Sequence, residues 1–125
     1  MKAIGKVSAL IAVMLAALAA VPADAATRKH RSPFDGLWSV LISTSRGSCG
    51  SYRAAVQIIG GRVMPAGGDF NASGAVSANG HAAVMVSSAL GSASGSGRLH
   101  GTQGAGRWSS AGGECAGGWS ALRRG

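Results

Sequence analysis

Few side chains in this 125-residue chain could carry out chemistry: it has four acidic residues, three histidines and two cysteines. Catalysis by paired carboxylates needs two acids held close together, whereas Asp35, Asp69 and Glu114 each lie next to a glycine in turn-like sequence. The chain has no Gly-x-Ser-x-Gly nucleophile elbow, phosphate-binding loop, dinucleotide fingerprint or zinc-ligand spacing. We therefore expect a binding protein that is not an enzyme and has no catalytic residue, metal or cofactor.

Basic side chains are the second source of chemistry, because Lys and Arg number 12 and the net charge is +8. Arginine carries a planar fork of donors that matches phosphate and carboxylate. Arg98 and Arg107, with His81 and His100, lie in segments that can share one face. We predict an anion-binding site held by the two arginines, to which the histidines add charge in mildly acidic conditions. The alternative is a solvated outer face with splayed arginines.

The two cysteines, Cys49 and Cys115, are predicted to form a disulfide. They lie 66 residues apart, and the chain-entropy model gives a loop of that length about 4 kcal/mol of stabilisation. A reactive thiol or a metal pair is the alternative, but no Cys-x-x-Cys motif or neighbouring histidine accompanies them. A disulfide in a domain this small indicates an oxidising compartment.

Residues 1–25 have the composition of a signal peptide. Lys2 and Lys6 accompany the apolar run 7–21, and Ala23-Asp24-Ala25 has the form of a cleavage site. The run is shorter than the roughly 20 residues that a membrane-spanning helix needs. We expect cleavage after Ala25 and a periplasmic or secreted protein that does not span the membrane, with an uncleaved anchor as the alternative.

The elements that would position these side chains follow from an alternation of apolar and polar residues with period two. Residues 26–33 lack this pattern and are predicted to form a flexible basic arm, and residues 34–125 a single domain. Short antiparallel strands in sequential order close into an up-and-down barrel, because open edges invite aggregation; a sandwich is the alternative. The predicted strands, about eight, are 37–43, 51–59, 62–66, 70–77, 81–88, 93–100, 104–110 and 115–124.

Turn positions predict how the strands pair. Ile58 should lie opposite Val63 across the Gly60-Gly61 turn. In the last hairpins Gly97 is predicted beside Trp108, Trp108 beside Gly117, and Gly106 beside Trp119, so that small residues make room for large rings inside a narrow barrel. The aromatic residues expected in the interior are Trp38, Tyr52, Phe70, Trp108 and Trp119.

The same pairing places His81 opposite His100 and Arg98 opposite Arg107 on the outer face. Like charges across a ladder oppose pairing, so this cluster is unfavourable unless an anion occupies it. A metal ion between the two histidines would lack a third ligand. Because the aromatic residues face inward, no stacking platform is available and we expect no specific nucleic-acid binding.

The chain resembles a group of small exported alphaproteobacterial proteins. This resemblance implies export and β-structure and carries no reaction. The stretches that carry it are 34–41, 46–49, 52–53, 60–63, 96–99 and 117–121.

Gly36-Leu37-Trp38, with a late Arg123 or Arg124, is similar to the calycin-type barrels, the lipocalins and avidins. The likeness implies an arginine packed across the tryptophan at a closed end of the barrel. The chain is shorter than a lipocalin and has few aromatic residues, so a cavity of lipocalin size is not expected. In size and disulfide count it also resembles eight-stranded exported protease inhibitors.

The function predicted from the sequence is therefore non-catalytic binding in the cell envelope. The partner is expected to be an anionic envelope component or an acidic protein, engaged through the arginine-rich surface. The alternative is a small protease inhibitor or a small-ligand carrier of calycin-like type.

Overall fold

The computed structural model describes residues 32–125. The predicted signal peptide, and residues 26–31 of the predicted basic arm, lie outside the described residues. Ser32 and Pro33, predicted as the end of that arm, instead form a turn that leads into the first strand, in which the Asp35 N–H donates to the Ser32 carbonyl (3.2 Å).

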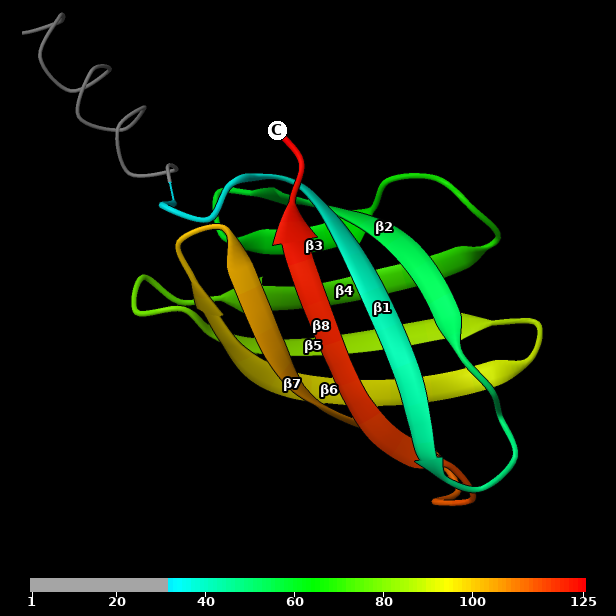
Figure 1. Cartoon of the computed structure of the whole chain (residues 1–125). Coiled ribbons are helices and arrows are strands. Elements are labelled where there is room, and N and C mark those ends of the chain that lie inside the picture. The colour runs from blue at the N-terminus through cyan, green and yellow to red at the C-terminus, as the bar shows by residue number, and fades with distance from the viewer. Residues whose placement is uncertain (1–31) are drawn as a thin grey trace, which may run out of the picture. The chain divides into compact units, whose positions relative to one another are not determined.

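The described residues form an all-β domain of eight strands. Each strand pairs antiparallel with the next and the last pairs with the first, which closes an up-and-down barrel (Figure 1). The predicted fold is thus confirmed, as a barrel and not a sandwich. The strands are β1 (Gly36–Arg46), β2 (Tyr52–Ile59), β3 (Arg62–Pro65), β4 (Phe70–Val76), β5 (His81–Ser88), β6 (Gly91–His100), β7 (Gln103–Ser110) and β8 (Ala116–Arg123).

Several predicted pairings are correct. Ile58 lies opposite Val63 across the Gly60-Gly61 turn, where both glycines have positive φ (59° and 79°), as a tight hairpin requires. On the β7–β8 ladder, Gly106 lies opposite Trp119 and Trp108 opposite Gly117, as predicted.

The β5–β6 and β6–β7 registers were predicted wrongly, each by two residues. Gly97 lies opposite Gly106, and Gly95 takes the predicted place beside Trp108. The β5–β6 shift arises because its turn consists of Ala89 and Leu90, and the β6–β7 shift because its turn consists of Gly101 and Thr102. Gly101 has φ 57° and takes the first central position, as type II′ turns favour. A shift of two residues keeps every side chain on its predicted face, so the inside and outside of the barrel are still assigned correctly.

One end of the barrel is filled and the other is less covered. The filled end holds Trp38, only 1% exposed, and Phe34, a core residue that the sequence prediction missed. Trp108 and Trp119 face inward toward the other end and are half-buried. The buried cluster at the filled end consists of Phe34, Trp38, Ile58, Val63, Val76, Ala82, Leu99 and Ala121.

The prediction that Tyr52 belongs to the core is wrong. Tyr52 is the first residue of β2, opposite Ile42, at the less covered end of the barrel, and it is 45% exposed. Phe70, the first residue of β4, is half-buried.

Residues 32–125 include no helical segment with the length and hydropathy that a membrane-spanning helix requires.

Candidate functional site

The four side chains of the predicted anion site lie on the outer face of β5, β6 and β7, and all four are exposed. We call this group the cationic face: His81, Arg98, His100 and Arg107. The prediction of two like pairs was wrong, because His81 lies opposite Arg98, His100 opposite Gln103, and Arg107 opposite Ser96. The two-residue shift in register is the reason.

The new pairing brings an arginine and a histidine into direct contact. Nη2 of Arg98 lies 3.4 Å from Nδ1 of His81. A guanidinium has donors and no acceptor, so in this contact Arg98 is the group that can donate and the imidazole nitrogen the group that can accept.

Arg107 and His100 flank this pair. Arg98 lies opposite Ala105, so Arg107 occupies the diagonal position on the same ladder, a separation that long side chains can span. His100 is the next residue on β6 to face the same side. Ala105 is small, which leaves the guanidinium groups accessible to a ligand.

Among residues 32–125, the structure shows no ion pair between an acidic side chain and the cationic face. Asp35 accepts hydrogen bonds from the N–H groups of Gly60 (2.9 Å) and Gly61 (3.1 Å). Glu114 accepts one from the hydroxyl of Ser110 (3.2 Å). Asp69 lies in the loop between β3 and β4. The cationic face is thus not neutralised by these carboxylates, and it can offer its donors to an external anion.

Asp35 fastens the turn before β1 to the β2–β3 hairpin. Its burial alone would raise the pKa of the carboxyl group. Hydrogen bonds from the backbone N–H groups of Gly60, Gly61 and Ser32, and from the Ser32 side chain, together outweigh burial and lower the pKa below its ordinary value. The sequence indicated a turn residue here, and the structure shows that it bridges two turns.

The filled end of the barrel carries the arginine–tryptophan contact expected from the calycin likeness. The guanidinium carbon of Arg123 lies 5.2 Å from the centre of the Trp38 ring. The indole N–H of Trp38 donates to the carbonyl of Phe34 (2.9 Å). Of the two candidates Arg123 is the one that packs on the ring, while Arg124 donates to the hydroxyl of Ser39 (3.1 Å).

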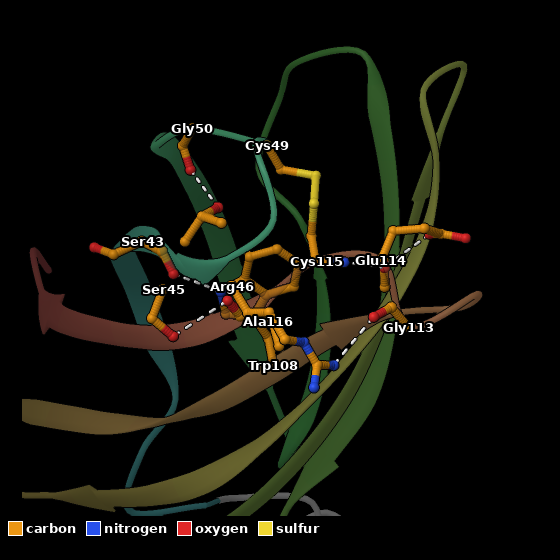
Figure 2. Close-up of a disulfide and its surroundings, with 12 residues drawn as sticks. Ser43, Ser45, Arg46, Cys49, Gly50, Trp108, Gly113, Glu114, Cys115 and Ala116 are labelled. Atoms are coloured by element: carbon orange, nitrogen blue, oxygen red, sulfur yellow. Dashed lines mark hydrogen bonds between the residues drawn. A yellow bond between two sulfur atoms is a disulfide. The ribbon is translucent and has the colours of Figure 1, made fainter.

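The predicted disulfide between Cys49 and Cys115 is confirmed. It joins the loop after β1 to the loop before β8, and Figure 2 shows Trp108 and Arg46 beside it. The indole N–H of Trp108 donates to the carbonyl of Ser43 (2.9 Å), and Nη2 of Arg46 donates to the carbonyl of Gly113 (3.1 Å). A disulfide is consistent with an oxidising compartment.

Within the part of the chain that the structure describes, no three side chains of His, Cys, Asp or Glu converge as metal ligands would. His81 and His100 are not paired with each other, so the two-histidine arrangement considered from the sequence does not form.

These features define a small eight-stranded up-and-down barrel, closed at one end by a tryptophan and an arginine. No protein-family model matches the chain, and no curated protein matches it either. Among solved structures it is similar to a redesigned β-barrel, mFAP1, bound to DFHBI, at 15% sequence identity and a TM-score of 0.45. The match covers 74% of this chain and 95% of that one. The resemblance to exported alphaproteobacterial proteins stays a prediction.

Proposed function

We propose that this protein is an exported, non-catalytic binding protein of the cell envelope that engages an anionic partner through its cationic face. The observation that carries the proposal is the contact of Arg98 with His81, with Arg107 and His100 exposed beside it. The signal-peptide pattern of residues 1–25 and the disulfide support export.

The histidines of the cationic face are expected to add positive charge to the site in mildly acidic conditions. Imidazole is the side chain that ordinarily changes charge between pH 5 and 8. A positively charged imidazole beside Arg98 would repel the guanidinium unless an anion bridged the two groups. On the other side of His81, Ser77 is uncharged and donates its N–H to the His81 carbonyl. Anion binding should therefore strengthen as the pH falls.

The test uses the mature, oxidised protein on a phosphate-bearing cation-exchange matrix eluted with a salt gradient. We expect the double variant Arg98→Gln/Arg107→Gln to elute at lower salt than Arg53→Gln/Arg62→Gln, which removes the same charge from exposed positions on β2 and β3. We also expect the wild-type protein to elute later at about pH 5.5 than at about pH 8, and this difference to shrink in His81→Gln.

Equal elution of the two double variants would show that total charge alone governs retention and would overturn the proposed site. Retention that persists unchanged at high salt, or no retention at all, would also count against an anionic partner.

A second candidate function is a small protease inhibitor or a small-ligand carrier. The observation that favours it is the uneven filling of the barrel, with half-buried Trp108 and Trp119 facing the less covered end. An apolar ligand entering there would change indole fluorescence. An inhibitor that uses the basic arm would lose inhibition when residues 26–33 are deleted.

A further inference from the structure

A group of apolar side chains lies on the outer face of the barrel, where β8, β1 and β2 run side by side (Figure 1). Leu37, Ile59 and Leu122 are 40%, 51% and 47% exposed. Each of them is next in sequence to a residue of the buried cluster. The period-two alternation of a strand therefore points all three side chains outward.

The strand ladders bring these three side chains together. Leu37 lies opposite Gln57, so Ile59 is its diagonal neighbour on β2. Ser39 lies opposite Leu122, so Leu122 is the diagonal neighbour of Leu37 on β8. Diagonal neighbours on one face are roughly 7–8 Å apart, which long side chains can span. We call Leu37, Ile59 and Leu122 the apolar patch.

Two arginines flank the apolar patch on the same outer face. Arg62 lies opposite Ile59 on the β2–β3 ladder and is exposed. Arg124 donates its backbone N–H to the carbonyl of Leu37 (2.6 Å). Its Nε donates to the hydroxyl of Ser39 (3.1 Å), which holds the guanidinium beside the patch. The patch thus has a cationic side chain on either side.

The carboxylate closest in sequence to the patch is bound by backbone. Asp35, two residues before Leu37, accepts hydrogen bonds from the N–H groups of Gly60 (2.9 Å) and Gly61 (3.1 Å). Its oxygens therefore face the β2–β3 turn, and the two arginines leave the rim of the patch positive.

The shape and charge of this face select its partner. A closed barrel has no free strand edge to which an extended peptide could add a strand. Its outer surface is convex, whereas a helix docks into a groove. A twofold contact between two copies would bring the arginine rim of one copy near that of the other. A lipid surface deforms around single apolar side chains, and its acidic headgroups attract arginine.

We infer that the apolar patch and its two arginines bind the surface of a membrane that contains anionic lipids. The three apolar side chains enter the headgroup region, and Arg62 and Arg124 contact lipid phosphates. The contact is peripheral. It does not use the cationic face on β5, β6 and β7, and so it goes beyond the proposed function.

The test is sedimentation of the mature, oxidised protein with vesicles of phosphatidylcholine and phosphatidylglycerol in a two-to-one ratio, compared with vesicles of phosphatidylcholine alone. We expect saturable binding to the mixed vesicles and much weaker binding to the others. The variant Leu37→Gln/Leu122→Gln should weaken binding at least about fivefold, because less apolar area enters the membrane. The matched control Met85→Gln/Leu90→Gln removes two exposed apolar side chains elsewhere on the barrel and should bind as the wild type does.

The arginines are tested at constant charge. The variant Arg62→Gln/Arg124→Gln should weaken vesicle binding at least about tenfold. The loss should exceed that in Arg98→Gln/Arg107→Gln, which removes the same charge from the cationic face. All these positions are exposed, so the variants keep the fold, and far-UV circular dichroism verifies it.

No binding to the mixed vesicles, equal binding to both kinds of vesicle, or equal losses in a variant and its matched control would overturn the inference. Self-association in solution that Leu37→Gln/Leu122→Gln abolishes, without vesicle binding, would overturn it too and assign the patch to a second copy. On the phosphate-bearing matrix, Leu37→Gln/Leu122→Gln should elute with the wild type. Failure of the anion site and failure of the membrane contact therefore give different results.

Discussion

Arg123 and Trp38 face each other across the β1–β8 ladder, with the guanidinium carbon 5.2 Å from the centre of the indole. Nη2 of Arg123 donates to the carbonyl of Pro33, which ties the turn before β1 to the end of β8. Within residues 32–125, Nε of Arg123 is buried without a hydrogen-bond partner. The cation–π contact therefore helps to stabilise the guanidinium group of Arg123, whose Nε–H has no hydrogen-bond acceptor.

Replacing Arg123 should destabilise the barrel. We expect Arg123→Gln to lower the free energy of unfolding by about 1–2 kcal/mol, because the cation–π contact and the link to Pro33 are both lost. Denaturant unfolding followed by tryptophan fluorescence measures it. The control Arg124→Gln, at an exposed position, should change stability by less than about 0.5 kcal/mol. Equal losses in both variants would contradict the role given to Arg123.

The disulfide should supply a large part of the stability of this domain. We expect the double variant Cys49→Ser/Cys115→Ser to lower the free energy of unfolding by about 4 kcal/mol, because the unfolded chain regains the entropy of a 66-residue loop. Chemical unfolding of the oxidised wild type and the variant gives the difference. A loss below about 1 kcal/mol would show that the cross-link does little beyond joining two loops.

The carboxylate of Asp35 should make stability depend on pH in the acid range. Its pKa is lowered in the folded protein, so its contribution is fully present above the pKa of the unfolded chain, at about pH 4, and is lost as the pH falls through the folded-state pKa. We expect Asp35→Asn to be less stable than wild type at neutral pH and to show a flatter decline between about pH 5 and pH 2. Parallel profiles of stability against pH for the two proteins would contradict this role of the Asp35 carboxylate.

Glycines beneath Trp119 should tolerate no side chain. A Cβ at Gly97 would lie 2.5 Å from Cζ2 of Trp119, and one at Gly106 would lie 2.7 Å from Cε2 of the same ring. We expect Gly97→Ala or Gly106→Ala to cost at least about 1–3 kcal/mol, because backbone as well as ring must move. Thermal unfolding tests this. The control Gly118→Ala, where the nearest atom is 3.4 Å away, should be nearly neutral, and a larger loss there would contradict the packing argument.

The fold was predictable because period-two alternation and tight turns act locally. The pairing of Ile58 with Val63 follows from the two glycines between their strands, and the disulfide from the only two cysteines. The sequence did not show which residues occupy the β6–β7 turn, since Gly101-Thr102 and Thr102-Gln103 both make a two-residue connection. That ambiguity moved every pair on the ladder by two positions.

The sequence predicted the face of the barrel on which the candidate site residues lie, but it did not predict which of them are in contact. Arg98 and His81 were placed on the same outer surface, but their direct contact depends on the register that the turns decide. Tyr52 was assigned to the interior because it alternates in step with the inward-facing residues of its strand. Its exposure, however, depends on how far along the barrel the covering side chains extend. Phe34 precedes the first strand, so no alternation marked it, although an apolar residue just before Asp35-Gly36 was a usable signal.

The link between Cys49 and Cys115 lies at the seam where the first and last strands meet. A protease that cut the exposed hairpin between Ala78 and Asn79 would therefore release neither half. One fragment would carry β1–β4 and the other β5–β8, and the pair would migrate as a single species until a reductant separated them. The two fragments would thus stay covalently joined after a single cut in the backbone.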